Sequence, residues 1–207
     1  MKRGTFISFE GGEGSGKSTQ IRFVASYFRR KRRKVLVVRE PGSTRLGESV
    51  RKILLNVRNR NMSVETELFF YLAARAQLVR EVIGPALRQG YVVISDRFED
   101  STLVYQGYAG GLGLARLATM VREARGNVVP SMTFLLDVEP RKGLLRSGRR
   151  DRMERKSILF HERIRKGYLL LARRYPKRFV VISSRLSKSE VRSAIRRTLD
   201  RVYSRSR

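Results

Sequence analysis

The chain has 207 residues, 41% of them hydrophobic, and a formal net charge of +28, a size that allows one α/β domain with a substantial core. It has no cysteine and one histidine, His161, which excludes disulfides and thiolate metal sites and argues against a histidine-based metal site or triad. No apolar run approaches the roughly 20 residues that span a bilayer, and the N-terminus leads straight into a strand-like run without a signal peptide, so we expect a cytoplasmic protein that does not enter membranes.

Apolar runs alternate with amphipathic stretches along the chain. In order, we predict a strand at Thr5–Phe9, a helix at Thr19–Phe28, a strand at Val35–Val38, helices at Gly47–Leu55 and Val64–Arg88, a strand at Tyr91–Ser95, a helix at Leu112–Ala124, a strand at Thr133–Val138, a helix at Ser157–Tyr175, a strand at Phe179–Ile182 and a capped helix from Ser187 to about Tyr203. Gly84-Pro85 should disturb the longest helix. Short strands separated by helices indicate a parallel sheet covered on both faces, in one domain over residues 1–207.

The loops after the strands are the expected functional region, because right-handed crossovers gather the carboxyl ends of parallel strands at one edge. Those loops contain Gly11–Ser18, Arg39-Glu40, Asp96-Arg97 and Asp137.

The loop after the first strand reads GGEGSGKS and fits the pattern Gly-x-x-x-x-Gly-Lys-Ser/Thr. Glycines let backbone N–H groups converge on phosphate oxygens, and the next helix points its positive end at the same place. Lys17 would reach the β- and γ-phosphates, and the Ser18 hydroxyl would bind magnesium. A chance match is the alternative, but the flanking strand and helix argue against it. The sequence therefore predicts nucleoside triphosphate binding by Gly11, Gly12, Glu13, Gly14, Ser15, Gly16, Lys17, Ser18 and Thr19.

The charge of +28 suggests affinity for polyanions. It is spread along the chain, and its densest cluster, Arg29–Lys34, lies at the end of a helix, where basic residues favour the helix dipole. An arginine-rich solvated surface is the interpretation we favour, with polyanion binding as an incidental property.

Arginines are concentrated in Arg141–Lys156, between the fourth strand and the long helix, and include Arg146, Arg149, Arg150, Arg152 and Arg155. In a protein that binds polyphosphate, this segment could be a mobile lid that brings guanidinium groups over the transferring phosphoryl. Composition alone favours the alternative of a solvated basic segment.

The segment Ile94–Gly107 reads ISDRFEDSTLVYQG and resembles the signature of thymidylate kinases, which is Asp-Arg-aromatic, two residues, Ser, and soon Tyr-Gln. Further segments resemble that family in the expected order, at Phe9–Gln20, Arg39–Gly42 and Asp151–Tyr168. The resemblance covers essentially the whole chain. It implies a P-loop NTPase fold of the nucleoside monophosphate kinase type, with a five-stranded parallel sheet and a short lid at about 141–156. It also implies a homodimer that transfers the γ-phosphoryl of ATP to dTMP with Mg²⁺, giving dTDP and ADP for dTTP synthesis.

At the phosphate and sugar end of dTMP, the resemblance implies that Arg97 and Arg51 hold the phosphate. Glu13 would accept a hydrogen bond from the sugar 3′-hydroxyl, and the Tyr105 ring would crowd the 2′ position and disfavour ribonucleotides. Surface salt bridges are the alternative for the two arginines.

At the base end, Tyr71 would stack on thymine and Arg75, one helical turn later, would bind a base oxygen. Gln106 would bind the pyrimidine edge, with Ser101 and Thr102 near the base. Core packing for Tyr71 and turn capping for the two hydroxyls are the alternatives. The full implied dTMP set is Glu13, Glu40, Arg51, Tyr71, Arg75, Arg97, Ser101, Thr102, Tyr105 and Gln106.

The family also implies the groups that act on the transferring phosphoryl. Some members place an arginine in the phosphate loop, where this chain has Gly14, and others supply it from the lid. The resemblance therefore favours a lid whose arginines act on the phosphoryl group over the solvated basic segment that composition alone favours. The implied catalytic residues are Lys17, Glu13, Arg97, Arg149 and Arg152, with Arg146 and Arg150 as further lid arginines. Magnesium is assigned to Ser18, with Asp96 as an outer carboxylate; a helix or turn cap is the alternative for Asp96.

The chain departs from the family in three places. Pro130-Ser131 replaces a frequent Pro-Asp, and Ser183–Arg185 stands where Asp-Ala is common near the adenine, which leaves the donor base open. If the match between this helix and the family pattern is shifted by one residue, Phe70 rather than Tyr71 would stack on the base.

Two rival functions remain. Another nucleoside monophosphate kinase is the nearer one, although Tyr105 and Gln106 argue against purine and ribose acceptors. A nucleic-acid-binding P-loop protein is the other, suggested by the charge of +28, but it offers no use for an acidic residue inside the phosphate loop.

Overall fold

A computed structural model describes residues 4–148, 151–183 and 185–203. Its sheet contains the strands β1 (Thr5–Glu10), β2 (Val35–Arg39), β3 (Val92–Asp96), β4 (Met132–Asp137) and β5 (Phe179–Ser183). They are all parallel, in the order β2-β3-β1-β4-β5. The five predicted parallel strands are confirmed, and the carboxyl ends of β1 and β3 meet at Phe9 and Asp96.

The α-helices are α1 (Lys17–Arg30), α2 (Arg45–Leu55), α3 (Val64–Leu78), α4 (Gly84–Arg88), α5 (Glu99–Thr102), α6 (Leu114–Arg125), α7 (Pro140–Ser147), α8 (Ile158–Arg174) and α9 (Lys188–Tyr203). A 3₁₀ turn spans Val57–Asn59, and π-helical stretches span Val79–Ile83 and Leu103–Ala109. The predicted helices are confirmed, but α5, the π-helical stretches and α7 were not predicted.

The predicted disturbance at Gly84-Pro85 takes the form of a π-helical turn. Pro85 has no amide hydrogen to donate, and the Gly84 N–H bonds the carbonyl of Val79, five residues back. The single helix predicted over Val64–Arg88 is therefore α3, the π turn and α4 in succession.

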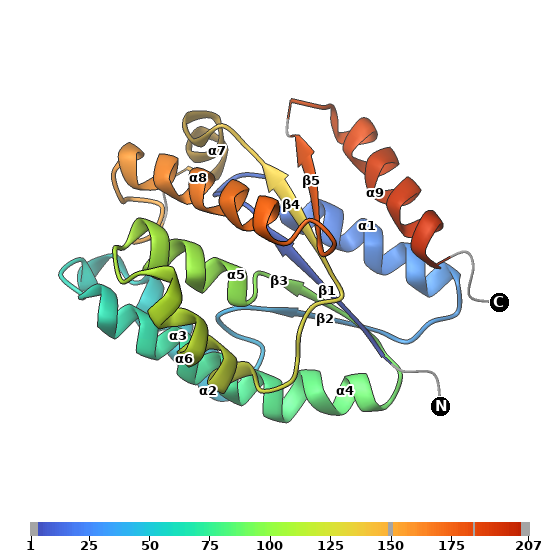
Figure 1. The fold of residues 1–207 in the computed structure, drawn as a ribbon, viewed down its shortest axis with the longest axis horizontal. Coiled ribbons are helices and arrows are strands. Elements are labelled where there is room, and N and C mark those ends of the chain that lie inside the picture. Colours follow the sequence, from blue (N-terminus) through green and yellow to red (C-terminus); the bar gives the residue numbers. More distant parts are fainter. Residues whose placement is uncertain (1–3, 149–150, 184, 204–207) are drawn as a thin grey trace.

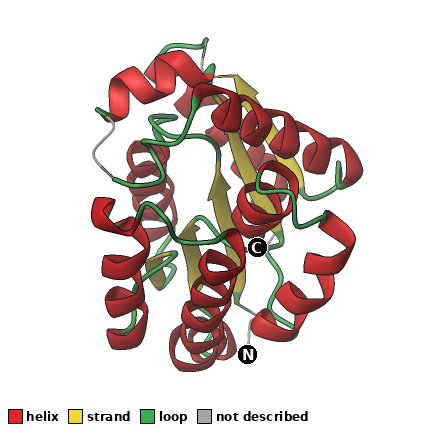
Figure 2. Ribbon diagram, turned by 90° about the vertical axis from the view of Figure 1, so that its left-hand side faces the viewer, coloured by secondary structure: helices red, strands yellow, loops and turns green. Residues whose placement is uncertain are grey.

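Helices cover both faces of the sheet, as Figure 2 shows. On one face α1 and α9 lie side by side (Figure 1), packed on Ile7, Phe9, Ile94 and Phe134. On the other, α4 packs near β3 and α8 near β4 and β5. Neighbouring β1 residues thus point into different cores: Ile7 and Phe9 face α1, whereas Phe6 belongs to the cluster with Val93 and Phe98.

Local capping explains where several helices begin. Thr44 and Ser63 accept hydrogen bonds from backbone N–H groups at the starts of α2 and α3. The predicted capping box is confirmed, because the Ser187 hydroxyl accepts from Glu190 N while Ser187 N donates to the Glu190 carboxylate. Within the described part of the chain, no helix combines the length and apolarity needed to cross a membrane.

Candidate active site

The phosphate loop joins β1 to α1 and is shaped by glycine. Gly11, Gly14 and Gly16 all have positive φ, and Gly16 at 89° turns the chain into α1. The Lys17 ammonium donates to the carbonyls of Gly11 and Gly12, at 3.2 and 3.3 Å, so the loop wraps around it. Burial and the nearby Arg97 lower the pKa of Lys17. This concentration of positive charge suits a polyphosphate.

A cavity of about 570 Å³ opens beside the loop, at the ends of β1, β2 and β3. Its lining contains every residue that the family resemblance assigned to dTMP: Glu13, Glu40, Arg51, Tyr71, Arg75, Arg97, Ser101, Thr102, Tyr105 and Gln106. Sequence reasoning missed five further lining residues, which are Pro41, Leu55, Phe98, Asp151 and Met153. Both Phe70 and Tyr71 pack against the cluster of Val50 and Leu54, but only Tyr71 also lines the cavity, which favours Tyr71 as the aromatic next to the base.

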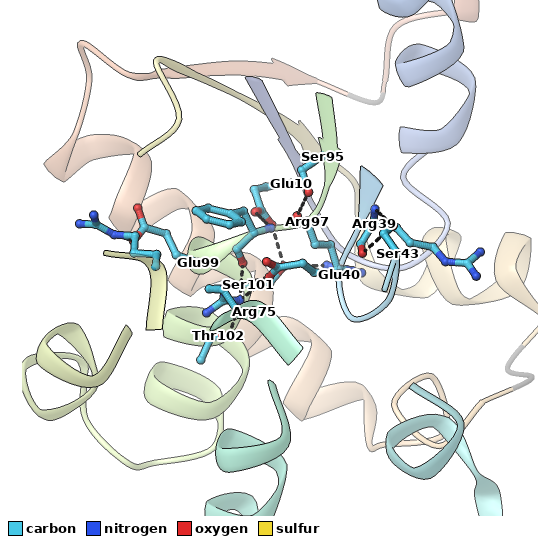
Figure 3. A network of polar contacts seen from close by, with 12 residues as sticks. Glu10, Arg39, Glu40, Ser43, Arg75, Ser95, Arg97, Glu99, Ser101 and Thr102 are labelled. Carbon is cyan, nitrogen blue, oxygen red and sulfur yellow. Dashed lines mark hydrogen bonds and ion pairs between the residues drawn. The ribbon is translucent and has the colours of Figure 1, made fainter. Parts of the chain in front are cut away.

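Arg97 is held in an unusual backbone conformation at the mouth of this cavity. Its φ is +69°, a left-handed value that costs a non-glycine residue energy and is concentrated at functional sites. The Ser95 hydroxyl donates to the Arg97 carbonyl at 2.5 Å, and Arg97 N donates to Phe9 O at 3.0 Å. The Ser95 bond ties the backbone to the end of β3 (Figure 3), and the Phe9 bond ties it to β1. The strained turn thereby aims the guanidinium back towards the phosphate loop.

The guanidinium of Arg97 binds Glu13, the acidic residue of the loop. Nη2 of Arg97 donates to Glu13 Oε1 at 2.8 Å, and the Tyr105 hydroxyl donates to the same oxygen at 2.6 Å. Burial works to raise the pKa of Glu13, but the charges of Arg97 and Lys17 and the Tyr105 hydrogen bond outweigh it and lower the pKa to about 2. Glu13 is therefore an ionised acceptor at neutral pH.

Arg75 lies at the far end of the cavity and is 1% exposed. It donates to Glu40 Oε2 from Nε at 2.9 Å and from Nη2 at 2.6 Å, and to the Thr102 hydroxyl at 2.9 Å. Its remaining nitrogen, Nη1, is buried and has no hydrogen-bond partner among the described residues. A buried N–H without a partner is costly, so this atom is a candidate donor to a bound ligand.

A buried carboxylate that sequence reasoning missed supports the same network. Glu10, the last residue of β1, accepts from Phe98 N at 2.7 Å, from the Ser101 hydroxyl at 2.7 Å and from the Tyr168 hydroxyl at 2.9 Å. Burial and repulsion from Asp100 raise the pKa of Glu10 to about 7, despite the hydrogen bonds that favour its charge. The only sequence signal was an acidic residue at the end of a buried strand.

The raised pKa of Glu10 predicts a dependence of stability on pH. Between the ordinary value near 4.5 and about 7, the native protein holds a proton that the unfolded chain releases, so the free energy of unfolding falls as pH rises through this window. Glu10→Gln should remove that fall. The free energy of unfolding of the variant minus that of the wild type should therefore be roughly 1–3 kcal/mol larger at pH 8 than at pH 5. Urea unfolding of both proteins at several pH values from 5 to 8 measures these free energies. The same change with pH in the variant and the wild type would contradict the prediction.

A second cavity, of about 1230 Å³, extends from the first along the phosphate loop. The two share Glu13, Glu40, Arg51, Arg97 and Asp151. Ser18 and Asp96 both line the second cavity. Their oxygens are the donors that Mg²⁺ prefers, so these residues fit the predicted ion. Among the described residues, no group of three or more His, Cys, Asp or Glu side chains could hold a metal alone.

One lid arginine reaches the phosphate cavity. Arg146, on α7, lines it together with Lys17 and Ser18. The helix lies directly against the loop, since a Cβ on Gly143 would come within 2.2 Å of Glu13 O. Arg149 and Arg150 lie outside the described residues.

Arg152 lies elsewhere. Its buried guanidinium donates to Glu67 Oε1 at 2.5 Å and to Leu54 O at 2.8 Å. Its assignment to the transferring phosphoryl stays a prediction, and this arrangement gives it another partner. Asp137, expected in a functional loop, forms a bidentate pair with Arg165, at 2.6 and 2.8 Å.

Comparison with known proteins agrees with this geometry. A family model described as Thymidylate kinase matches residues 9–195. The chain belongs to the thymidylate kinase family. A curated thymidylate kinase of a Thermoanaerobacter species is 46% identical over 182 residues, covering 87% of this chain and 89% of its own. That of Symbiobacterium thermophilum is 46% identical over 202 residues, covering 97% and 94%.

A crystal structure of thymidylate kinase from Ehrlichia chaffeensis superposes with a TM-score of 0.78 at 33% identity, covering 96% of this chain and 99% of that one. The fold is therefore that of a P-loop nucleoside monophosphate kinase, and membership of the thymidylate kinase family makes the protein a phosphotransferase.

Proposed function

We propose that the protein transfers the γ-phosphoryl of ATP to dTMP, giving dTDP and ADP, with the residues assigned above. One observation carries the assignment of the site. The cavity lined by the predicted dTMP residues and the cavity along the phosphate loop meet at Glu13 and Arg97. An acceptor phosphate at this junction faces the γ-phosphoryl of a donor held by the loop.

Positioning is the main task in this reaction. A phosphate oxygen of dTMP attacks the γ-phosphorus, the bond to the β–γ bridging oxygen breaks, and ADP leaves with that oxygen. Arg97 and Arg51 hold the acceptor phosphate, and Lys17 offsets charge on the donor phosphates. Arg51 is half-buried and anchored by a hydrogen bond from Nη1 to Pro41 O at 3.0 Å. Ser18 and Asp96 would hold a Mg²⁺ ion, which would neutralise phosphate charge.

The nucleoside occupies the deeper end of the cavity. Tyr71 stacks on the base, the free Nη1 of Arg75 donates to a base oxygen, and Gln106 faces the pyrimidine edge. Near the sugar, the Tyr105 hydroxyl donates a hydrogen bond to Glu13 at 2.6 Å, which fixes the position of the tyrosine ring. The ring then sterically excludes a 2′-hydroxyl. Ser101 and Thr102 have structural partners as well, in Glu10 and Arg75.

The lid supplies the charge that Gly14 cannot. Arg146 already lines the phosphate cavity, and Arg149 and Arg150 follow it closely in the chain. These guanidinium groups stabilise the charge that spreads over the phosphoryl oxygens in the transition state. A homodimer, cytoplasmic location and incidental polyanion binding stay predictions; light scattering during gel filtration measures the first.

ADP release from ATP and Mg²⁺ tests the function, with dTMP, dUMP, dCMP, UMP, GMP or no acceptor. We expect release that depends on dTMP, with UMP and GMP far weaker. A preference for another nucleotide would identify a different monophosphate kinase. Release without an acceptor, or only with nucleic acid, would refute the proposal and favour the NTPase or nucleic-acid class.

A further inference from the structure

Another buried carboxylate, Glu67, lies beneath the base end of the cavity. It is 1% exposed on α3, one helical turn before Tyr71 and two turns before Arg75, so the three side chains leave the helix on one side. Glu67 does not line the cavity itself. It reaches the nucleobase pocket only through the side chains that it binds.

The two oxygens of Glu67 have different partners. Oε2 accepts from the side-chain amide of Gln106, at 3.0 Å from Nε2. Oε1 accepts from Arg152 Nη1 at 2.5 Å and from Lys156 Nζ at 2.8 Å. Burial alone would raise the pKa of Glu67, but the hydrogen bond and charge of Lys156 and the hydrogen bonds from Arg152 and Gln106 outweigh it and lower the pKa. Glu67 is therefore ionised at neutral pH and can only accept hydrogen bonds.

An acceptor-only partner decides which way the Gln106 amide points. Reversing the amide would place its carbonyl oxygen against the Glu67 carboxylate and leave both without a donor, which is costly in a buried site. Nε2 must therefore face Glu67. The carbonyl oxygen Oε1 has no partner among the described residues, and Gln106 lines the cavity. Oε1 is thus the atom that Gln106 offers to a base.

The pocket then presents a donor and an acceptor to the base, namely Nη1 of Arg75 and Oε1 of Gln106. Thymine and uracil present the complementary pair, an oxygen at C4 and a hydrogen at N3. Cytosine presents the reverse, an amino group at C4 and an unprotonated N3. We propose that Glu67 is a positioning residue that fixes the Gln106 carbonyl oxygen towards the base and so selects thymine and uracil over cytosine. This inference rests on the proposed function.

The test compares kcat/KM for dTMP and for dCMP in the wild type and in Glu67→Gln. A glutamine at position 67 must turn its oxygen towards Arg152 and Lys156, which only donate, so its amide nitrogen faces Gln106 and the Gln106 amide reverses. We expect the ratio of dTMP to dCMP to fall about 10- to 100-fold. Where dCMP turnover is too slow to measure, its inhibition constant against dTMP replaces it. An unchanged ratio would overturn the proposal, even if kcat/KM falls for both nucleotides. A purely structural role of Glu67 would lower kcat/KM for dTMP and for dCMP by the same factor.

Lys156→Met is the matched control. It removes another partner of the same carboxylate but leaves the hydrogen bonds from Arg152 and Gln106, which still favour the ionised form of Glu67, so the ratio should stay within about threefold of the wild type. An equal fall in both variants would overturn the proposal. Should Glu67→Gln fail to fold, Glu67→Asp keeps an acceptor-only group and should preserve the ratio; its collapse there would also overturn the proposal. A wild type that does not phosphorylate dTMP would instead refute the proposed function.

Discussion

Lys17→Ala should lower the rate of dTMP-dependent ADP release by roughly 30- to 1000-fold, which corresponds to about 2–4 kcal/mol of transition-state stabilisation. The Lys17 ammonium is buried among the loop carbonyls, where a charge acts through little solvent. No other described lysine shares its position between Gly11, Gly12 and Ser15.

The exposed Lys166 on α8 offers a charge-matched control. Lys166→Ala should retain the wild-type rate, and thermal unfolding should show that Lys17→Ala is still folded. A folded Lys17→Ala protein with a rate within a few-fold of the wild type would show that the loop lysine is not part of the reaction.

Arg97→Ala should cost a similar 30- to 1000-fold, about 2–4 kcal/mol, with both a lower kcat and a higher KM for dTMP. The substitution removes the phosphate clamp. It also removes the charge that most lowers the pKa of Glu13, so the pKa of that carboxyl should rise towards its ordinary range. Activity of the variant should therefore fall further as pH decreases, whereas the wild type keeps Glu13 ionised down to low pH.

Arg97→Lys separates charge from geometry. Lysine keeps the charge but cannot donate to Glu13, Gly11 and Ser101 from one planar group, as Arg97 does. We expect activity between that of Arg97→Ala and the wild type, while the exposed Arg173→Ala on α8 should match the wild type. Unchanged phosphorylation of dTMP by Arg97→Ala would contradict the assignment of the acceptor site.

The elements of the fold followed from local patterns. Five short apolar runs separated by helical stretches predicted the parallel sheet, because strands buried on both faces must be apolar throughout. Three local features were also predictable, because each depends on a few neighbouring residues. They are the phosphate loop, the capping box at Ser187 and the break near Pro85. The π-helical stretch Leu103–Ala109 was not, since its sequence carries no local mark that separates it from an α-helix.

Part of the site was predictable as well. The residues of the Asp96–Gln106 segment and the Tyr71–Arg75 turn were identified by resemblance to a family, and the structure gathers them around one cavity. Their partners were not predictable, because a buried charge is bound by whichever group the packing brings to it.

Arg152 shows most clearly what the sequence alone determined and what the tertiary structure decided. The sequence marks it as one of several arginines in a lid segment, with the chemistry to bind phosphate. The folded chain places it against Glu67, 85 residues away along the sequence, in a site too buried to leave either charge without a partner. Residue types and their spacing determined the sheet and the phosphate loop, and the resemblance to a family implied the class of reaction. Only the long-range packing of α3, the lid segment and the strand ends decided which carboxylate each arginine binds, because such pairs form between elements that no local pattern connects.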